Sequence, residues 1–66
     1  MDGITAFLIV RDEERTLPRC LDSLAGVADE VVVLDTGSRD GTPALLAAEQ
    51  ARGRFRRFRW RTAPFA

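Results

Sequence analysis

Four consecutive apolar residues, Val31 to Leu34, end abruptly in Asp35 and a cluster of Gly, Ser and Asp residues. A short apolar run bounded by turn residues predicts a strand buried on both faces, as in a parallel sheet. Thr42 and Pro43 then predict the start of a helix, with Thr42 as the N-cap and Pro43 in the first helical position. Asp35 is therefore expected at the carboxyl end of a parallel strand, facing the crevice where open α/β sheets bind ligands.

A second apolar run, Ile4 to Val10, also has the length and composition of a buried parallel strand. Four charged residues, Arg11 to Glu14, end this run. The spacing predicts a helix over residues 17–25, with Thr16 as N-cap and a stop at Gly26. The apolar face expected for this helix consists of Leu17, Cys20, Leu21 and Leu24.

The rest of the chain predicts one more helix and one more strand. The helix is expected over residues 43–52 and ends at Gly53. Three aromatic residues, Phe55, Phe58 and Trp60, predict a weaker strand in which Phe55 is out of phase with the other two.

The predicted order is β-α-β-α-β, which makes the fold class α/β. Right-handed crossovers place the strands parallel in the order 3-2-1, as half of a doubly wound, Rossmann-like sheet. The apolar first strand, at residues 4–10, would lie unpaired at one edge of that sheet. We therefore expect residues 1–66 to form a single partial domain, a truncated version of a longer one.

The composition excludes several classes of protein. The longest apolar run is far below the ~18–20 residues that a transmembrane helix needs, and no secretory signal pattern is expected at the start. One Cys and no His leave no intrachain disulfide, no usual zinc ligand set and no His-based triad. This cysteine usage favours a reducing, cytoplasmic environment. The phosphate-binding loop with Gly-Lys-Ser/Thr and the Gly-x-Gly-x-x-Gly motif do not occur.

The chemistry is expected where the first two strands end, because neighbouring parallel strands bring their carboxyl ends together. One strand end offers Arg11 to Glu14, and the other offers Asp35 to Asp40. Carboxylates there can accept hydrogen bonds from a base or a ribose, so nucleotide recognition is a natural use. The acids at 12–14 can instead favour the positive end of a helix, and Ser38 and Asp40 fit the roles of turn and cap residues.

Six arginines crowd the segment from Arg52 to Arg61, and the chain has no lysine. Together with the aromatic residues they suggest an alternative function, a small non-catalytic module that binds nucleic acid or acidic polymers. We favour core packing for the aromatic residues and a solvated strand for the arginines, and so expect no nucleic-acid partner. Cys20 is likewise expected in the core.

Three segments resemble the start of family-2 glycosyltransferases, especially a bacterial branch. They are Ile9 to Glu14, Leu17 to Leu24 and Asp29 to Thr42, and they cover nearly the whole chain in the family's order. The resemblance implies the GT-A fold, with a nucleotide-binding half-sheet at its start. It also implies transfer of a sugar from a nucleotide-sugar donor, usually a UDP-sugar, to an acceptor hydroxyl.

The resemblance also implies which residues would bind the nucleotide. Val10 and Arg11 would border the nucleoside, Glu13 matches the acid near the ribose or base, and Asp35 matches the acid that ends the second strand. Thr36 takes the position where many relatives have a second acid that reads the base.

The metal motif Asp-x-Asp of the family, which holds Mg²⁺ or Mn²⁺ on the donor diphosphate, has no counterpart in these residues, and neither has the catalytic base. We therefore expect no catalytic residue, metal ligand or cofactor within the chain, and expect the 66 residues alone to be inactive.

Overall fold

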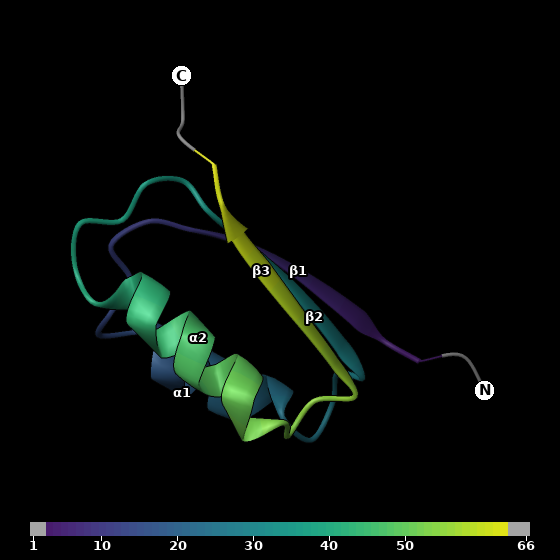
Figure 1. The fold of residues 1–66 in the computed structure, drawn as a ribbon. Coiled ribbons are helices and arrows are strands. Elements are labelled where there is room, and N and C mark those ends of the chain that lie inside the picture. Colours follow the sequence, from purple (N-terminus) through teal and green to yellow (C-terminus); the bar gives the residue numbers. More distant parts are fainter. Residues whose placement is uncertain (1–2, 64–66) are drawn as a thin grey trace.

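The computed structural model describes residues 3–63 as three strands and two helices that alternate along the chain (Figure 1). The elements in order are β1 (Thr5–Val10), α1 (Leu17–Leu24), β2 (Glu30–Asp35), α2 (Thr42–Arg52) and β3 (Arg57–Thr62). The strands form one parallel sheet in the order β1-β2-β3, with β2 in the middle. This arrangement confirms the predicted topology, in which the first strand lies at one edge.

The register of the sheet brings the carboxyl ends of all three strands to one edge. Val10 of β1 pairs with Asp35 of β2, which pairs in turn with Thr62 of β3. The loops that follow β1 and β2 therefore leave the sheet side by side.

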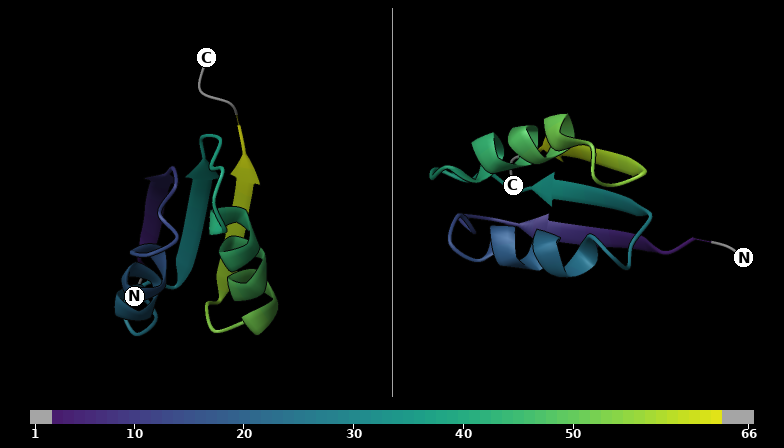
Figure 2. Two further views of the ribbon diagram at one scale, coloured as in Figure 1. Left: turned by 90° about the vertical axis from the view of Figure 1, so that its left-hand side faces the viewer. Right: turned by 90° about the horizontal axis from the view of Figure 1, so that it is seen from below.

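Both helices cover the same face of the sheet (Figure 2). Two crossovers of the same hand that step in the same direction place their helices on the same side. The opposite face has no covering element among residues 3–63.

The prediction of strands buried on both faces was therefore wrong. In β2, Val31 and Val33 face the helices and are buried, whereas Val32 and Leu34 face the other way and are half-buried. In β1, large apolar side chains such as Phe7 are exposed. A run of apolar residues shows that these side chains favour burial. Both faces of such a strand are buried only where helices cover both faces of the sheet.

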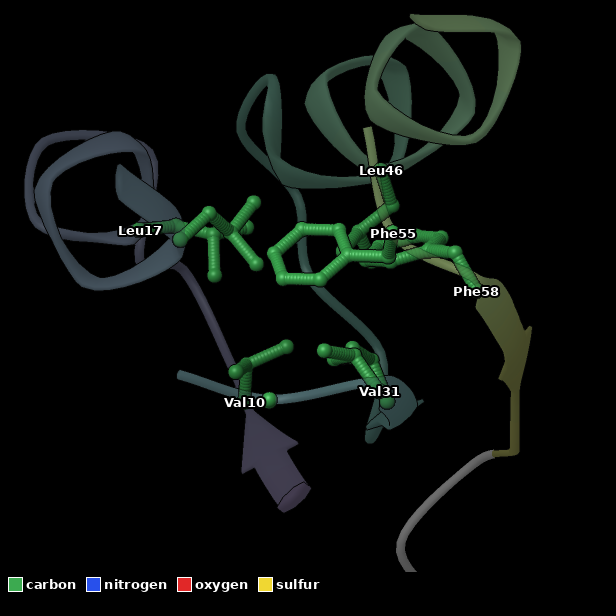
Figure 3. Close-up of a cluster of buried hydrophobic side chains, with 9 residues drawn as sticks. Val10, Leu17, Val31, Leu46, Phe55 and Phe58 are labelled. Atoms are coloured by element: carbon green, nitrogen blue, oxygen red, sulfur yellow. The ribbon is translucent and has the colours of Figure 1, made fainter. Parts of the chain in front are cut away.

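The core lies between the two helices and the sheet (Figure 3). It consists of Val10, Leu17, Leu21, Ala28, Val31, Val33, Leu46, Phe55 and Phe58. Phe55 was out of phase in the sequence because it precedes β3, in the turn after α2, and its ring stacks on that of Phe58 at 5.7 Å. The aromatic residues Phe55 and Phe58 are core residues, as predicted, and Trp60 packs against the same cluster.

Two local predictions about the helices were wrong. Cys20 is exposed, because α1 turns Leu17 and Leu21 to the sheet and leaves Cys20 in an open hollow beside the edge strand β1. Thr42 is the first residue of α2 rather than its N-cap, a position that Gly41 occupies. Thr16 does occupy the N-cap of α1, although its side chain makes no capping hydrogen bond.

A charged network that the sequence did not predict joins the two helices. Glu49 of α2 is buried and accepts two hydrogen bonds from Arg54, from Nε at 2.7 Å and from Nη2 at 2.9 Å. The Arg54 Nη2 atom also lies 2.8 Å from a carboxylate oxygen of Asp22 in α1. Hydrogen bonds to Glu49 and then to Asp22 raise the pKa of Arg54, so the guanidinium stays charged.

No helix within residues 3–63 is long and apolar enough to cross a membrane.

Candidate functional site

The candidate site lies at the carboxyl edge of the sheet, where two loops run side by side. The first loop, residues 11–16, joins β1 to α1, and the second, residues 36–41, joins β2 to α2. Thr36 begins the second loop by donating two hydrogen bonds to the carbonyl of Val10, from its N–H at 3.0 Å and from its hydroxyl at 3.3 Å. The parallel pairing of the strands thus continues for one residue into the loops.

Asp12 holds the first loop to the second from an unusual backbone conformation. Its φ is 52°, in the left-handed region that Asp and Asn adopt more readily than most residues. Its N–H donates to the hydroxyl of Ser38 at 2.7 Å, and its Oδ1 accepts from the N–H of Arg39 at 2.7 Å. These two hydrogen bonds fix the turn directly after β1.

Thr42 makes the next connection between the loops. Its hydroxyl accepts from the N–H of Glu13 at 2.9 Å and donates to Oδ1 of Asp40 at 2.6 Å. Oδ1 of Asp40 also accepts from the N–H of Thr42 at 2.9 Å, which supplies the acceptor that Gly41 lacks at the helix start. The hydrogen bond from the Thr42 hydroxyl lowers the pKa of Asp40.

Glu14 completes the contacts between the loops. Its N–H donates to Oδ2 of Asp40 at 3.2 Å, and its Oε1 accepts from the N–H of Gly41 at 3.0 Å. A Cβ atom at position 41 would lie only 2.7 Å from Oε2 of Glu14, so a larger residue there would displace the Glu14 carboxylate from this contact.

Asp35 lies beneath the second loop and is completely buried. Its Oδ1 accepts three hydrogen bonds, from the N–H groups of Gly37 and Ser38 at 3.1 Å and 2.9 Å and from the hydroxyl of Ser38 at 2.7 Å. Its Oδ2 is buried and has no hydrogen-bond partner among the described residues. Because Ser38 also accepts from Asp12, the buried carboxylate is linked through one hydroxyl to the first loop.

The predicted site residues all lie at this edge but differ in accessibility. Val10 and Asp35 are buried, Thr36 is half-buried, and Arg11 and Glu13 are exposed. Arg11 and Glu13 therefore offer side chains to a ligand directly, whereas Asp35 in this conformation contacts its own loop. A binding role for the five residues stays a prediction.

The surface beside the loops is a shallow hollow of about 470 Å³ with an acidic lining. The residues that line it are Asp12, Glu13, Glu14, Arg15, Thr16 and Asp40. Carboxylate oxygens accept hydrogen bonds, so this surface suits hydroxyl and N–H donors better than it suits phosphate oxygens.

Ser38 and Asp40 make the contacts of turn and cap residues, in agreement with that interpretation of the sequence. Sequence reasoning missed the bonds of Asp12 to the second loop and the central place of Thr42. The spacing of the polar residues Asp35, Ser38, Asp40 and Thr42 contained the signal. Each of these four side chains accepts a hydrogen bond from a backbone N–H of one of the two loops.

Within residues 3–63 no group of three or more Cys, Asp or Glu side chains could hold a metal ion. The carboxylates of Asp12, Glu14 and Asp40, which line the acidic hollow, each accept backbone hydrogen bonds from the opposite loop or the helix start. A hard cation needs several oxygen ligands that converge on one point. The described part of the chain does not fit the Mg²⁺ or Mn²⁺ that the resemblance implies for a complete domain.

Comparison with known proteins gives one family. A family profile described as glycosyl transferase family 2 matches residues 5–65. A TPR repeat-containing protein of Synechococcus elongatus is 56% identical over 45 residues, which are 68% of this chain and 11% of that protein. The lipopolysaccharide core biosynthesis glycosyltransferase LpsC of Rhizobium meliloti is 46% identical over 43 residues, 65% of this chain and 16% of that protein.

An uncharacterized glycosyltransferase of Rickettsia felis is 40% identical over 50 residues, which are 76% of this chain and 17% of that protein. The chain therefore spans less than one fifth of the length of these curated relatives. No solved structure matches the chain.

Proposed function

Because the chain belongs to glycosyl transferase family 2, we propose that it binds the nucleotide of a nucleotide-sugar donor at the carboxyl edge of its sheet. The donor is a UDP-sugar, and the whole protein transfers the sugar to an acceptor hydroxyl. In that reaction the acceptor oxygen forms a bond to the anomeric carbon of the sugar, the bond from that carbon to the diphosphate breaks, and the hydroxyl proton passes to a base.

One observation carries the proposal: four hydrogen bonds between the loops after β1 and β2, and a fifth from the first loop to Thr42 at the start of α2, join them into a single edge rich in acceptors. Open α/β sheets bind ligands in the crevice outside the carboxyl ends of their strands. The backbone at Asp12, in its left-handed conformation, is held by partners 26 and 27 residues away. A site fixed in this way needs little reordering when a ligand arrives.

Thr36 supports recognition of a base that carries an N–H donor. Its hydroxyl hydrogen is directed to the carbonyl of Val10, so the oxygen lone pairs remain able to accept a hydrogen bond. A uracil ring has one such donor, its N3–H. Glu13, on the exposed side of the first loop, accepts from the ribose hydroxyls.

Asp35 acts as a positioning residue in this proposal. It is completely buried and accepts its hydrogen bonds from Gly37 and Ser38, so it shapes the loop that presents Thr36 rather than touching the nucleotide. Arg11 and Arg15 in the first loop and Arg39 in the second are the exposed cations of this edge, and they can approach the diphosphate.

Nuclear magnetic resonance titration of the ¹⁵N-labelled chain with UDP tests the proposal. We expect millimolar affinity, about 4 kcal/mol, with the shifts confined to the loops at residues 11–16 and 36–41. Thr36→Val removes the hydroxyl but keeps the shape, and should weaken UDP binding about fivefold, the equivalent of one neutral hydrogen bond.

Thr5→Val is the matched control, because Thr5 is an exposed threonine at the opposite, amino end of β1. It should leave the affinity for UDP unchanged. Shifts that map to the amino end of the sheet, or equal affinities for UDP in the Thr36→Val and unaltered chains, would refute the proposed position of the base.

A further inference from the structure

The hydroxyl of Thr16 is used by a side chain of the first loop and not by the helix that Thr16 begins. Thr16 is the N-cap of α1, and a threonine there ordinarily accepts a hydrogen bond from the N–H of the second or third helical residue. The second residue is Pro18, which has no N–H. The backbone of Thr16, at φ −100° and ψ −24°, is helical instead of extended, and its side chain makes no capping hydrogen bond. Its hydroxyl donates to Oε2 of Glu13 at 2.5 Å.

Glu13 is also fixed through its main chain. Its N–H donates to the hydroxyl of Thr42 at 2.9 Å, and its carbonyl accepts from the N–H groups of Thr16 and Leu17 at 3.1 Å and 2.8 Å. Glu13 is thus tied to the starts of both helices. The second carboxylate oxygen, Oε1, accepts no hydrogen bond within residues 3–63, and the residue is exposed. One oxygen of Glu13, in a set position, is therefore open to a ligand.

The other anchored glutamate of the chain has a different kind of partner. Glu49 gives both of its carboxylate oxygens to the guanidinium of Arg54, so no oxygen is left for a ligand. A hydroxyl takes one oxygen only and brings no charge of its own, so the Glu13 carboxylate keeps its charge and a strong acceptor. Glutamate loses considerable rotamer freedom when it binds a ligand, and a side chain that is already held loses less.

The choice of partner by Thr16 also points to the site. Proteins depart from locally stabilising arrangements such as a helix cap mainly where function requires it. Thr16 and Glu13 both line the acidic hollow beside the two loops. The missing cap and the bond to Glu13 therefore occur together at the edge where we place the nucleotide.

We propose that Thr16 is a positioning residue of this site, which holds the Glu13 carboxylate so that Oε1 accepts a hydrogen bond from a ribose hydroxyl. The inference rests on the proposed nucleotide site. It makes the ribose, and neither the base nor the diphosphate, the part of the ligand whose binding depends on Thr16. A carboxylate accepts from a hydroxyl but repels phosphate oxygens, and Thr16 itself does not touch the nucleotide.

Nuclear magnetic resonance titrations with UDP and with dideoxyuridine diphosphate, which lacks both ribose hydroxyls, test the inference. We expect the unaltered chain to bind UDP about tenfold more tightly than the dideoxy compound, as one hydrogen bond to a charged group provides. Thr16→Val removes the hydroxyl but keeps the shape. It should weaken UDP binding about fivefold, the cost of ordering one side chain, and leave the affinity for the dideoxy compound unchanged.

Two variants serve as controls, and circular dichroism verifies that each is folded. Thr16→Ser keeps the hydroxyl and should restore the preference for UDP. Ser23→Ala removes a hydroxyl of α1 that donates only to its own helix, at the carbonyl of Arg19, and should leave the preference unchanged.

The ligand pair separates failure of the inference from failure of the proposed function. If Thr16→Val weakens the binding of both compounds alike, Thr16 only shapes the loop and the inference is wrong. It is also wrong if Thr16→Val keeps the full preference for UDP. If neither compound shifts the loops of the unaltered chain, the proposed nucleotide site is itself refuted, and the inference with it.

Discussion

Replacing Asp35 with alanine should destabilise the chain severely, because this carboxylate holds the second loop. The change removes three hydrogen bonds to Oδ1, two of them from backbone N–H groups that then lack a partner. Leaving a buried donor unsatisfied costs about 1–3 kcal/mol. We therefore expect Asp35→Ala to lower the free energy of unfolding by about 2–4 kcal/mol.

That loss is comparable with the whole stability of so small a domain, which rarely exceeds ~3–5 kcal/mol. Asp35→Asn should cost less, about 1 kcal/mol, because the amide oxygen still accepts from Gly37 and Ser38 while the charge is lost. The order of stability should be the unaltered chain, then Asp35→Asn, then Asp35→Ala.

Urea unfolding at pH 7, followed by the fluorescence of Trp60 and by circular dichroism, measures these differences. Asp29→Ala is the control: it removes an exposed acid that accepts one hydrogen bond, from the N–H of Ile4 at 3.2 Å. It should change the unfolding free energy by about 0.5 kcal/mol or less. If Asp35→Ala is no less stable than this control, Asp35 does not hold the loop and the reasoning fails.

Three further predictions concern charge and activity. Arg54→Ala should lower the urea midpoint more than Glu49→Gln does, because it removes both hydrogen bonds to the buried carboxylate of Glu49 and leaves it only the exposed Arg52, 3.9 Å away; the reverse order would contradict the assignment of Glu49 as the buried member. Hydrogen bonds from Arg59 and then Thr5 lower the pKa of Glu30 below its ordinary value of 4.5, so this stabilisation is complete above that value and is lost as the pH falls through the lowered pKa. Glu30→Gln should therefore flatten the fall of the urea midpoint in acid, and an unchanged pH profile would argue against the contact. The purified 66-residue chain should transfer no sugar from UDP-sugars, as measured by release of UDP, and measurable turnover would show that it holds a base we have not identified.

The order of elements could be predicted from the sequence because strong local signals agree. Two apolar runs of strand length end in charged or turn residues, and Gly53 ends the second helix in the left-handed conformation expected of a terminal glycine. The parallel order then follows from the chirality of the crossovers. These signals depend on residues near one another in sequence, so they can be recognised without knowledge of the tertiary structure.

The errors arose where a residue's environment depends on distant segments. Cys20 has helical spacing with buried leucines, but it lies in an open hollow beside the edge strand β1 and is exposed. Thr42 is a favourable N-cap by type, yet its hydroxyl is already used by Glu13 and Asp40, so Asp40 supplies the acceptor for the first N–H of the helix. The burial of Glu49 depends on its hydrogen bond with Arg54. Arg54 lies after the end of α2, so the helical pattern of the sequence does not predict this contact.

Asp35 shows how far sequence reasoning reaches at the candidate site. An acid that ends an apolar strand is costly to bury unless it is hydrogen-bonded, and a ligand is only one source of donors. Gly37 and Ser38, two and three residues later, supply the donors from the chain itself, as Asp side chains often arrange in turns. The sequence therefore placed Asp35 at the carboxyl edge of the sheet, where the structure has it, but the accessible groups there are the neighbours of Asp35. Thr36 follows it directly with a free acceptor, and Glu13 faces solvent on the adjoining loop. The nucleotide recognition that we propose at this edge depends on how rigidly Asp35 and Asp12 hold those neighbours in place.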